Sequence, residues 1–291
     1  MEAVVELGFK RWLRSRVNTV SATIHEICPE IYLVKFSLSG VKYLFPAMKC
    51  KCSEKNIVKI NGKEFCEAEY CNGYIDKLFA CDKVTVDNHD FEPSVLEGAI
   101  AEDATNPHVS LVSNRGKYVL KGYRIHASWN PEPLFLRFLR ETSLAPKLSL
   151  SYSYMGVTLG VVTEFISGGI DPGAIFYESL VHTLRGEGFI IPEKEIAGIA
   201  RTVAEFHNRM SRCREEWCEP ATASKEDLEV WFRRFSTYVS RIKGLVLPRE
   251  IKRIFTVYPF PHFERFLGKT IIATHQDLHF SQMLKTKDRF Y

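Results

Sequence analysis

The stretch His275-Gln-Asp-Leu-His-Phe-Ser-Gln282 decides how this 291-residue chain is interpreted. Asp277 is followed five residues later by Gln282, so an acid and an amide stand close together in the chain. A positioned carboxylate can accept the proton of a reacting hydroxyl group, and an amide carbonyl is the kind of hard oxygen ligand that Mg²⁺ takes. The chain holds only two glutamines, Gln276 and Gln282, and both lie in this octet. The octet is therefore the first candidate for a functional site.

The segments that precede the octet predict a short antiparallel sheet followed by helices. Residues 109–113 and 117–123 are typical of two strands joined by a turn at 114–116, and Lys121 lies in the second strand. Asn130-Pro-Glu-Pro133 favours a helix start, because proline is accepted in the first helical turn. The remaining predicted elements are a helix at 134–140, a strand at 159–166, a flexible break at 167–169, and helices at 196–210, 228–242 and within 251–267.

Residues 1–95 predict a β-rich unit. The pairs Ser39-Gly40 and Asn61-Gly62 each indicate a hairpin turn, and Asn-Gly is among the strongest signals for a two-residue turn. The first 14 residues, in which charged residues interrupt the apolar ones, predict one amphipathic helix. The strands of the two hairpins are expected at 31–38 with 41–45 and at 58–60 with 63–65.

Composition restricts the class of protein. Apolar residues make up 45% and charged residues 25% of the chain, which is typical of a globular protein. Lys plus Arg number 39 and Asp plus Glu 35, so the net charge of +4 gives no sign of a nucleic-acid partner. The N-terminus lacks the pattern of a signal peptide, and no apolar run is long enough for a membrane span. We expect a cytoplasmic protein without a membrane partner.

The eight cysteines leave three states open. Reduced, buried thiols are the first expectation, because the chain shows no secretion signal. A zinc site is the second, since Cys50-x-Cys52 precedes Cys66-x4-Cys71, although neither pair has the usual two-residue spacer. Intracellular disulfides, which occur in hyperthermophiles, are the third. The scarcity of glutamine points in the same thermophilic direction.

The octet, and the order of elements before it, resemble the maltokinases and more broadly the aminoglycoside-phosphotransferase-like sugar kinases, a branch of the protein-kinase-like fold. That family usually has H-G-D in this loop, and the maltokinase branch has glutamine where Gln282 stands. The stretch Lys121-Gly-Tyr-Arg124 and Asn130-Pro-Glu-Pro133, with Arg137-Phe-Leu139, resembles the maltokinase segment between strand and helix. In the N-terminal region, Arg11 and Trp12 resemble part of the family's cap.

The resemblance implies an α+β, protein-kinase-like two-lobed fold with an N-terminal β-rich cap and an incomplete helical C-terminal lobe. Residues 1–95 would form the cap subdomain. Residues 96–168 would form the N-lobe, an antiparallel sheet plus a helix, with a hinge near 164–168. Residues 169–291 would form a partial C-lobe that carries the catalytic loop 275–282.

The resemblance also implies a role for each candidate residue. Asp277 would be the catalytic base, His275 would brace the loop, Gln282 would bind Mg²⁺ and His279 would contact the substrate. Lys121 would hold the ATP phosphates. The family's helix glutamate falls at Leu134 here, so Glu132, two residues earlier, is the alternative partner of that lysine. The other expected ATP contacts are Asn106, at the tip of a phosphate-covering turn over 102–108, and the backbone groups of Glu164 and Ile166 beside adenine.

The implied reaction is transfer of the ATP γ-phosphoryl group to the anomeric hydroxyl of maltose, which gives maltose 1-phosphate. The rivals are a glucosamine or aminoglycoside kinase and a non-catalytic nucleotide-binding or interaction protein. After its loop the family continues into a D-F-E segment, whereas this sequence stops at Tyr291. We therefore expect no maltose phosphorylation by this chain alone, and a complementing C-terminal chain is a further expected partner.

Overall fold

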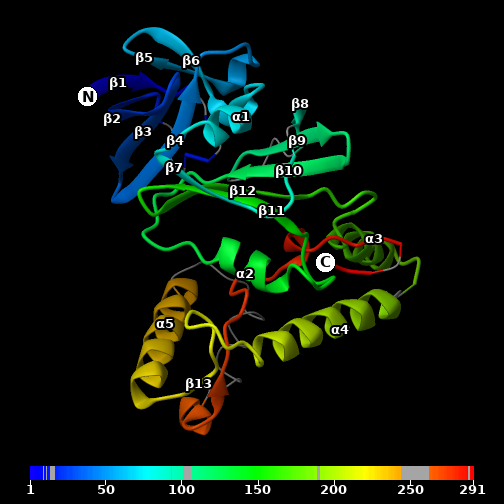
Figure 1. Cartoon of the computed structure of the whole chain (residues 1–291). Helices are drawn as coiled ribbons and strands as arrows, with labels where there is room; N and C mark the ends of the chain where they lie inside the picture. The colour runs from blue at the N-terminus through cyan, green and yellow to red at the C-terminus, as the bar shows by residue number, and fades with distance from the viewer. Residues whose placement is uncertain are drawn as a thin grey trace. The chain divides into compact units, whose positions relative to one another are not determined.

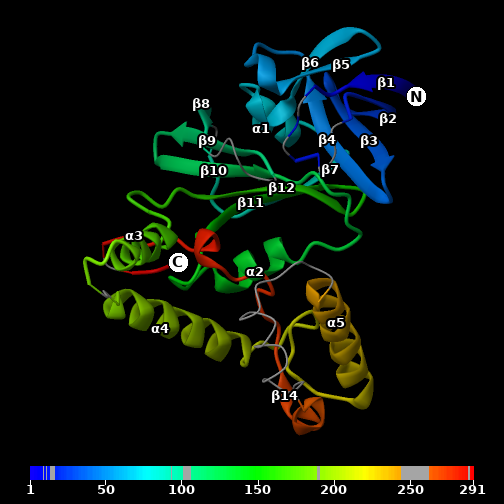
Figure 2. The same cartoon turned by 180° about the vertical axis from the view of Figure 1, so that it is seen from behind.

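The structure is a computed structural model, and it describes residues 1–8, 10, 12–13, 17–92, 94–100, 106–188, 191–243, 262–287 and 289–291. The chain divides into two compact units, Met1–Ile170 with Tyr291, and Asp171–Phe290. The first unit contains two antiparallel sheets and two short helices, and the second is mainly helical (Figures 1 and 2). No helix in the described ranges is both long enough and apolar enough to cross a membrane.

The first sheet of the first unit is a closed barrel with the strand order β1-β2-β3-β4-β6-β5 (blue in Figure 1). Both predicted hairpins are confirmed, since β3 pairs with β4 from Ile31–Met48 to Leu38–Val41, and β5 pairs with β6 about Asn61-Gly62. The barrel strands are β1 (Glu2–Glu6), β2 (Thr19–Cys28), β3 (Ile31–Leu38), β4 (Val41–Met48), β5 (Ile57–Ile60) and β6 (Lys63–Glu67).

The predicted N-terminal helix is wrong. Glu2–Glu6 is strand β1, in which Ala3 and Val5 are buried and their neighbours are exposed. This alternation has the period of two that marks a strand with one buried face. Backbone pairing of β1 with both β2 and β5 closes the barrel, so tertiary pairing decides the conformation of this segment.

The second sheet has the order β7-β11-β12-β10-β9-β8, and all its pairs are antiparallel. The predicted hairpin at 109–123 is present as β9 and β10. β7 lies inside the range 1–95 that was expected to form the cap, yet it pairs with β11. The strands are β7 (Val84–Asn88), β8 (Val95–Ala99), β9 (His108–Ser113), β10 (Gly116–Gly122), β11 (Leu148–Tyr154) and β12 (Val157–Glu164).

The second sheet is apolar on both faces. One face contributes Leu120, Leu150 and Val162 to a large core that also takes in barrel residues and helix α1 (Tyr74–Phe79). The other face buries a smaller cluster of Tyr123, Leu148 and Val161, against which Leu136 of helix α2 (Glu132–Leu139) packs. The sheet is thereby held between the α1 side and α2.

Among the described residues, the second unit contains three α-helices, two short 3₁₀ helices and a pair of short strands. Helix α3 is Gly173–Leu184, α4 is Glu193–Met210 and α5 is Lys225–Lys243. The helices expected at 196–210 and 228–242 are confirmed as α4 and α5. Most of the range 251–267, in which a further helix is expected, lies outside the described residues; its described part, 262–267, holds the short helix η3 (Phe263–Phe266). Strand β13 (Ala221–Thr222) pairs with β14 (Thr270–Ile271).

The cysteines are oxidised, so the expectation of reduced thiols is wrong. The disulfides are Cys28–Cys81, Cys50–Cys71, Cys52–Cys66 and Cys213–Cys218. Three of them lie in the first unit, and two of these fix both ends of the segment Cys66–Cys71. Such cross-links stabilise a fold chiefly by restricting the unfolded chain.

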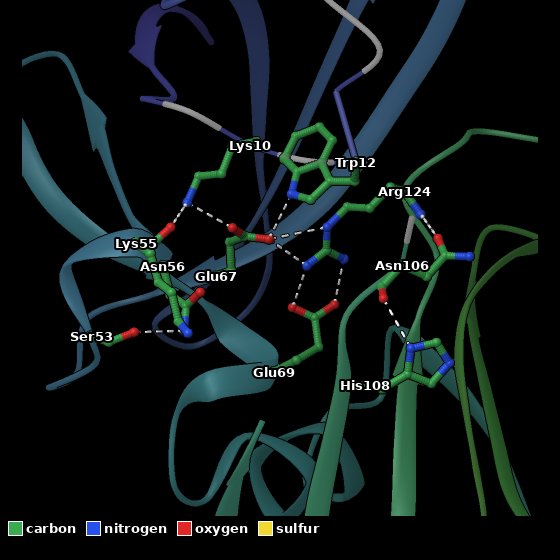
Figure 3. Close-up of polar contacts among 10 residues, drawn as sticks. All are labelled: Lys10, Trp12, Ser53, Lys55, Asn56, Glu67, Glu69, Asn106, His108 and Arg124. Atoms are coloured by element: carbon green, nitrogen blue, oxygen red, sulfur yellow. Dashed lines mark hydrogen bonds and ion pairs between the residues drawn. The ribbon is translucent and has the colours of Figure 1, made fainter. Parts of the chain in front are cut away.

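The segment between Cys66 and Cys71 carries Glu67 and Glu69, which bind the buried guanidinium of Arg124 (Figure 3). The Arg124 side chain is 1% exposed. Its Nη2 lies 2.7 Å from Oε2 of Glu67 and 3.0 Å from Oε2 of Glu69, while its Nη1 lies 2.7 Å from Oε1 of Glu69. Lys10 adds an ion pair to Glu67 at 2.8 Å, and the Trp12 indole donates to Glu67 at 3.1 Å. Two cations thus face two carboxylates.

Arg124 joins the barrel to the second sheet. It follows the end of β10 by two residues, and its carbonyl accepts a hydrogen bond from the Leu44 N–H of β4 at 2.9 Å. Close packing surrounds the ion cluster, because a Cβ on Gly122 would lie 2.2 Å from Oε1 of Glu69. The network therefore fixes the chain immediately after the strand that carries Lys121.

The pKa of Glu67 follows from two opposing effects. Burial by itself raises the pKa of this carboxyl, but the positive charges of Arg124 and Lys10, with their hydrogen bonds, outweigh it and leave the pKa below its ordinary value of 4.5. The two carboxylates together raise the pKa of Arg124 despite its burial. Glu67 and Arg124 are therefore both kept in their ionised forms near neutral pH.

Replacing Arg124→Met should lower the free energy of unfolding by about 3–5 kcal/mol, because two buried carboxylates lose their main counter-charge. Lys117→Met is the matched control. Lys117 lies on β10 and pairs with Glu97 at the surface, where both side chains are nearly half exposed. That loss should be under about 1 kcal/mol. Urea unfolding near neutral pH measures both values, and equal losses would contradict the role of the buried network.

Acid should weaken the first unit through Glu67. A carboxyl with a lowered pKa in the folded state contributes stability above its unfolded pKa, and this contribution is lost as the pH falls through the folded pKa. The free energy of unfolding should therefore fall from about pH 5 downward. Glu67→Gln should flatten this part of the profile in urea titrations at successive pH values. An unchanged slope would assign the acid sensitivity to other groups.

Candidate functional site

Lys121 and Glu132 form a close ion pair between strand β10 and helix α2. The Lys121 Nζ lies 2.7 Å from Oε1 and 2.8 Å from Oε2 of Glu132. The lysine side chain is 24% and the glutamate side chain 36% exposed, so both groups remain open to a ligand. Glu132 lies in the first turn of α2, and from there its carboxylate reaches Lys121. It therefore makes the lysine contact that was expected of a glutamate at position 134.

The start and end of helix α2 are fixed by separate contacts. At the start, the Glu132 N–H donates to Oδ1 of Asn130 at 3.1 Å, which satisfies one of the free N–H groups of the first turn. At the end, the Arg140 guanidinium donates to the Leu148 carbonyl at 3.1 Å and to Asp90 at 2.7 Å. Arg137 also binds Asp87 of β7. These contacts hold Glu132 in register with Lys121.

Burial and charge alter the groups around the ion pair. Burial raises the pKa of the Tyr123 hydroxyl, and the Glu132 carboxylate raises it further. Burial lowers the pKa of His108, the residue opposite Lys121 on β9, and the lysine charge adds to that effect. The side chains of Tyr123 and His108 therefore both favour their neutral forms near pH 7.

Asn106, the expected tip of the phosphate-covering turn, lies two residues before strand β9, and residues 102–105 of that turn are outside the described ranges. Its side-chain Oδ1 accepts a hydrogen bond from the Arg124 N–H at 3.2 Å, and its carbonyl lies 3.0 Å from Nδ1 of His108 (Figure 3). The Asn106 side chain thus ties β9 to the segment after β10. Its expected contact with phosphate stays a prediction.

The expected hinge residues lie at the end of strand β12, with Glu164 as its last residue and Ile166 two residues beyond it. The Glu164 N–H donates to the Lys147 carbonyl at 2.9 Å, and the Ile166 carbonyl accepts from the Gly169 N–H at 3.3 Å. A contact with the edge of adenine would therefore use the carbonyl of Glu164 and the N–H of Ile166. These two groups are one acceptor and one donor, which is the pair that the adenine edge requires.

The octet 275–282 is an exposed loop of the second unit. His275, Asp277, His279 and Gln282 are all exposed. Gln276 has a φ of +64°, a left-handed conformation that glycine adopts without cost. It occupies the position at which the resembling family has glycine in H-G-D, so the backbone here keeps a glycine-like turn with a larger residue. The Gln282 amide nitrogen lies 3.4 Å from Nε2 of His279.

Apolar contacts hold the loop in place. The Phe280 ring stacks on Phe176 of α3 with a centroid distance of 4.4 Å, and Met283 is buried. A Cβ on Gly173 would lie 3.1 Å from the Cβ of Phe280, so the first residue of α3 has to be small for the loop to approach it. On the N-terminal side, β14 ends shortly before His275 and is held by β13.

The candidate residues fall into two groups, one in each compact unit. Lys121, Glu132, Asn106, Glu164 and Ile166 belong to the first unit. The loop residues His275, Asp277, His279 and Gln282 belong to the second. The loop offers a carboxylate and an amide oxygen, a donor set that fits Mg²⁺, which binds few protein oxygens and keeps several waters.

Sequence reasoning missed the residues that support the first group. In the sequence, Arg124 stands out only as part of the stretch that resembles the maltokinases, and nothing in their residue type distinguishes Glu67 and Glu69 from other acids. The only sequence signal for Glu67 and Glu69 is their place between Cys66 and Cys71 in a β-rich region. Two exposed acids would give the same pattern. Trp12 is 7% exposed and donates to Glu67, so its role is structural, whereas Arg11 lies outside the described residues.

The comparisons with known proteins concern the fold. A solved structure of a glucosamine kinase is similar to this chain at 16% sequence identity with a TM-score of 0.63, and the match covers 98% of this chain and 69% of that one. No family model and no curated protein matches the sequence. A likeness at this identity shows a shared fold. It does not show a shared activity, because one fold can serve several activities. The chain thus has a mixed fold of sheets and helices similar to that of a sugar kinase.

Proposed function

We propose that this protein is an ATP-dependent sugar kinase, which transfers the γ-phosphoryl group of ATP to a sugar hydroxyl. The observation that carries the proposal is the ion pair of Lys121 with Glu132, in a fold similar to that of a glucosamine kinase. In kinases, a strand lysine held by a helix glutamate positions the α- and β-phosphates. The spacing of Asp277 and Gln282 in the octet supports the same reaction from the other unit.

Each residue has a defined task in this reaction. Lys121 holds the phosphates, and Glu132 fixes the direction of its ammonium group. The Glu164 carbonyl and the Ile166 N–H bind adenine. Asp277 takes the proton of the attacking hydroxyl, while His275 braces the loop and His279 contacts the sugar. Mg²⁺, held by Gln282, supplies neutralisation of the phosphate charge.

The sugar is either maltose or an amino sugar. The sequence of the octet favours maltose with attack by its anomeric hydroxyl, and the similar solved structure favours glucosamine. An assay of phosphoryl transfer from [γ-³²P]ATP to maltose, glucosamine and an aminoglycoside separates these candidates. Tight Mg-ATP binding without transfer to any of the three would favour the rival interpretation, a non-catalytic nucleotide-binding protein.

Lys121→Met should weaken Mg-ATP binding at least about tenfold, because the phosphates lose a charge-assisted hydrogen bond worth about 1.5–3 kcal/mol. Lys117→Met, the same chemical change on the same strand, should leave the affinity unchanged. Isothermal titration calorimetry measures both. Equal affinities for the two variants would remove Lys121 from the nucleotide site.

Asp277→Asn should reduce the rate of sugar phosphorylation by about 10²–10⁴, since the general base is lost while the shape of the side chain is kept. Mg-ATP affinity should stay within about twofold, because the base acts on the sugar hydroxyl. Asp82→Asn, at an exposed position of the first unit, serves as the control. A rate unaffected by Asp277→Asn would refute the assignment of the base.

A further inference from the structure

Four cysteines of the first unit gather at one point. Cys50 and Cys52 follow strand β4, Cys66 lies in β6, and Cys71 follows the short helix η2 (Ala68–Tyr70). The Sγ atoms of Cys50, Cys66 and Cys71 all lie within 4.8 Å of one another, and Cys52 is bonded to Cys66. The disulfides Cys50–Cys71 and Cys52–Cys66 are therefore parts of one cluster of four sulfurs.

The cluster has the number and kind of ligands that a structural zinc site requires. Zinc sites of this class hold four thiolates in a tetrahedron with Zn–S bonds of about 2.3 Å, which places the sulfurs about 3.8 Å apart. Three of the sulfurs, those of Cys50, Cys66 and Cys71, already lie within 4.8 Å of one another, and the fourth, that of Cys52, is bonded to Cys66, so the four start close to the spacing that zinc requires. Cys66 and Cys71 are buried and the other two are half-buried, so the site would be shielded yet within reach of an ion.

Two positively charged residues stand beside the first two cysteines in the sequence. Lys49 and Lys51 flank Cys50 and precede Cys52, and both lysines are exposed. A zinc ion with four thiolates carries a net charge of −2, which two adjacent lysines offset.

We propose that the four cysteines 50, 52, 66 and 71 form a zinc site when the chain is reduced, and that this site replaces the two disulfides. Two equivalents of a dithiol break the two S–S bonds; each dithiol becomes a cyclic disulfide, and the protein gains four thiols. One Zn²⁺ then binds the four sulfurs and displaces four protons. The cysteines of the other two disulfides, Cys28–Cys81 and Cys213–Cys218, are not ligands of the proposed zinc ion.

Replacing the two disulfides with zinc would keep the segment Cys66–Cys71 restrained in both the oxidised and the reduced protein. Cys66 and Cys71 are the two ends of the segment that carries Glu67 and Glu69, the acids that bind Arg124. The two disulfides restrain this segment when the protein is oxidised. Zinc would restrain the same four positions in a reducing compartment, where such disulfides are reduced. The inference is independent of the proposed kinase function.

The test uses the whole chain, reduced with dithiothreitol, freed of metal and reductant without air, and titrated with Co²⁺ and then Zn²⁺. We expect one Co²⁺ per chain with the intense visible bands of a tetrahedral tetrathiolate site, and displacement of that cobalt by zinc. Zinc should also raise the melting temperature of the reduced chain. A reduced chain that binds less than one metal ion, or whose spectrum shows fewer thiolates, would overturn the proposal.

Two replacements at one position separate metal binding from the disulfide. Neither Cys52→Ser nor Cys52→His can form the bond to Cys66, but histidine can ligate zinc and serine is a poor ligand. Zinc should therefore stabilise reduced Cys52→His nearly as much as reduced wild type, and reduced Cys52→Ser much less. Equal responses of the two variants would contradict the site.

The double variant Cys213→Ser/Cys218→Ser is the matched control, because it removes a disulfide of the other unit. It should keep one metal ion per chain with the tetrathiolate spectrum. Loss of the metal in this variant would move the site away from the cluster and overturn the assignment. If the reduced chain unfolds without metal, zinc should restore the fold of wild type and of Cys52→His, and failure of both to refold would count against the proposal.

Discussion

The first unit depends on the burial of the Arg124 guanidinium between two carboxylates. A buried charge is tolerated only when its hydrogen-bonding groups are paired, and here Glu67 and Glu69 accept from three nitrogens of one side chain. The pairing requires the barrel and the second sheet to be in register, because the acids come from one and the arginine from the strand end of the other. Lys121 lies only three residues before Arg124, so the buried ion pairs of Arg124 also fix the position of Lys121 relative to α2.

The two groups of candidate residues are held in position by different kinds of contact. The first group is fixed by ionic contacts, since Lys121 is oriented by Glu132 and Glu132 by the Asn130 cap. The loop is fixed by apolar ones, since Phe280 and Met283 pack into the second unit while the polar side chains stay exposed. The side chains of His275, Asp277, His279 and Gln282 are exposed, and Gln282 and His279 contact each other at 3.4 Å.

Local signals predicted much of the sheet structure. Asn61-Gly62 and Ser39-Gly40 specify their own turns, and the apolar period of α4 specifies a helix. The prediction for the N-terminal segment was wrong because Glu2–Glu6 is too short for its apolar period to distinguish a strand from a helix. The pairing of this segment with β2 and β5 determines its strand conformation. The Cys28–Cys81 disulfide and the contacts of Arg124 with Glu67 were not predicted either, because both join residues more than fifty positions apart. Glu132 was recognised as a possible partner of Lys121, but only the helix geometry shows how it reaches the lysine.

The left-handed turn at Gln276 has a consequence for the behaviour of the loop on heating. Glycine at such a position samples many backbone conformations in the unfolded chain and in partly opened loops, whereas glutamine samples few. Holding glutamine at a φ of +64° costs local energy, and at a positive φ this cost exceeds the entropy that glutamine saves in the unfolded chain. The loop that carries Asp277 is therefore kept in this shape by contacts outside the turn, such as the Phe280–Phe176 stack, and heat that loosens those contacts would release the strain at Gln276.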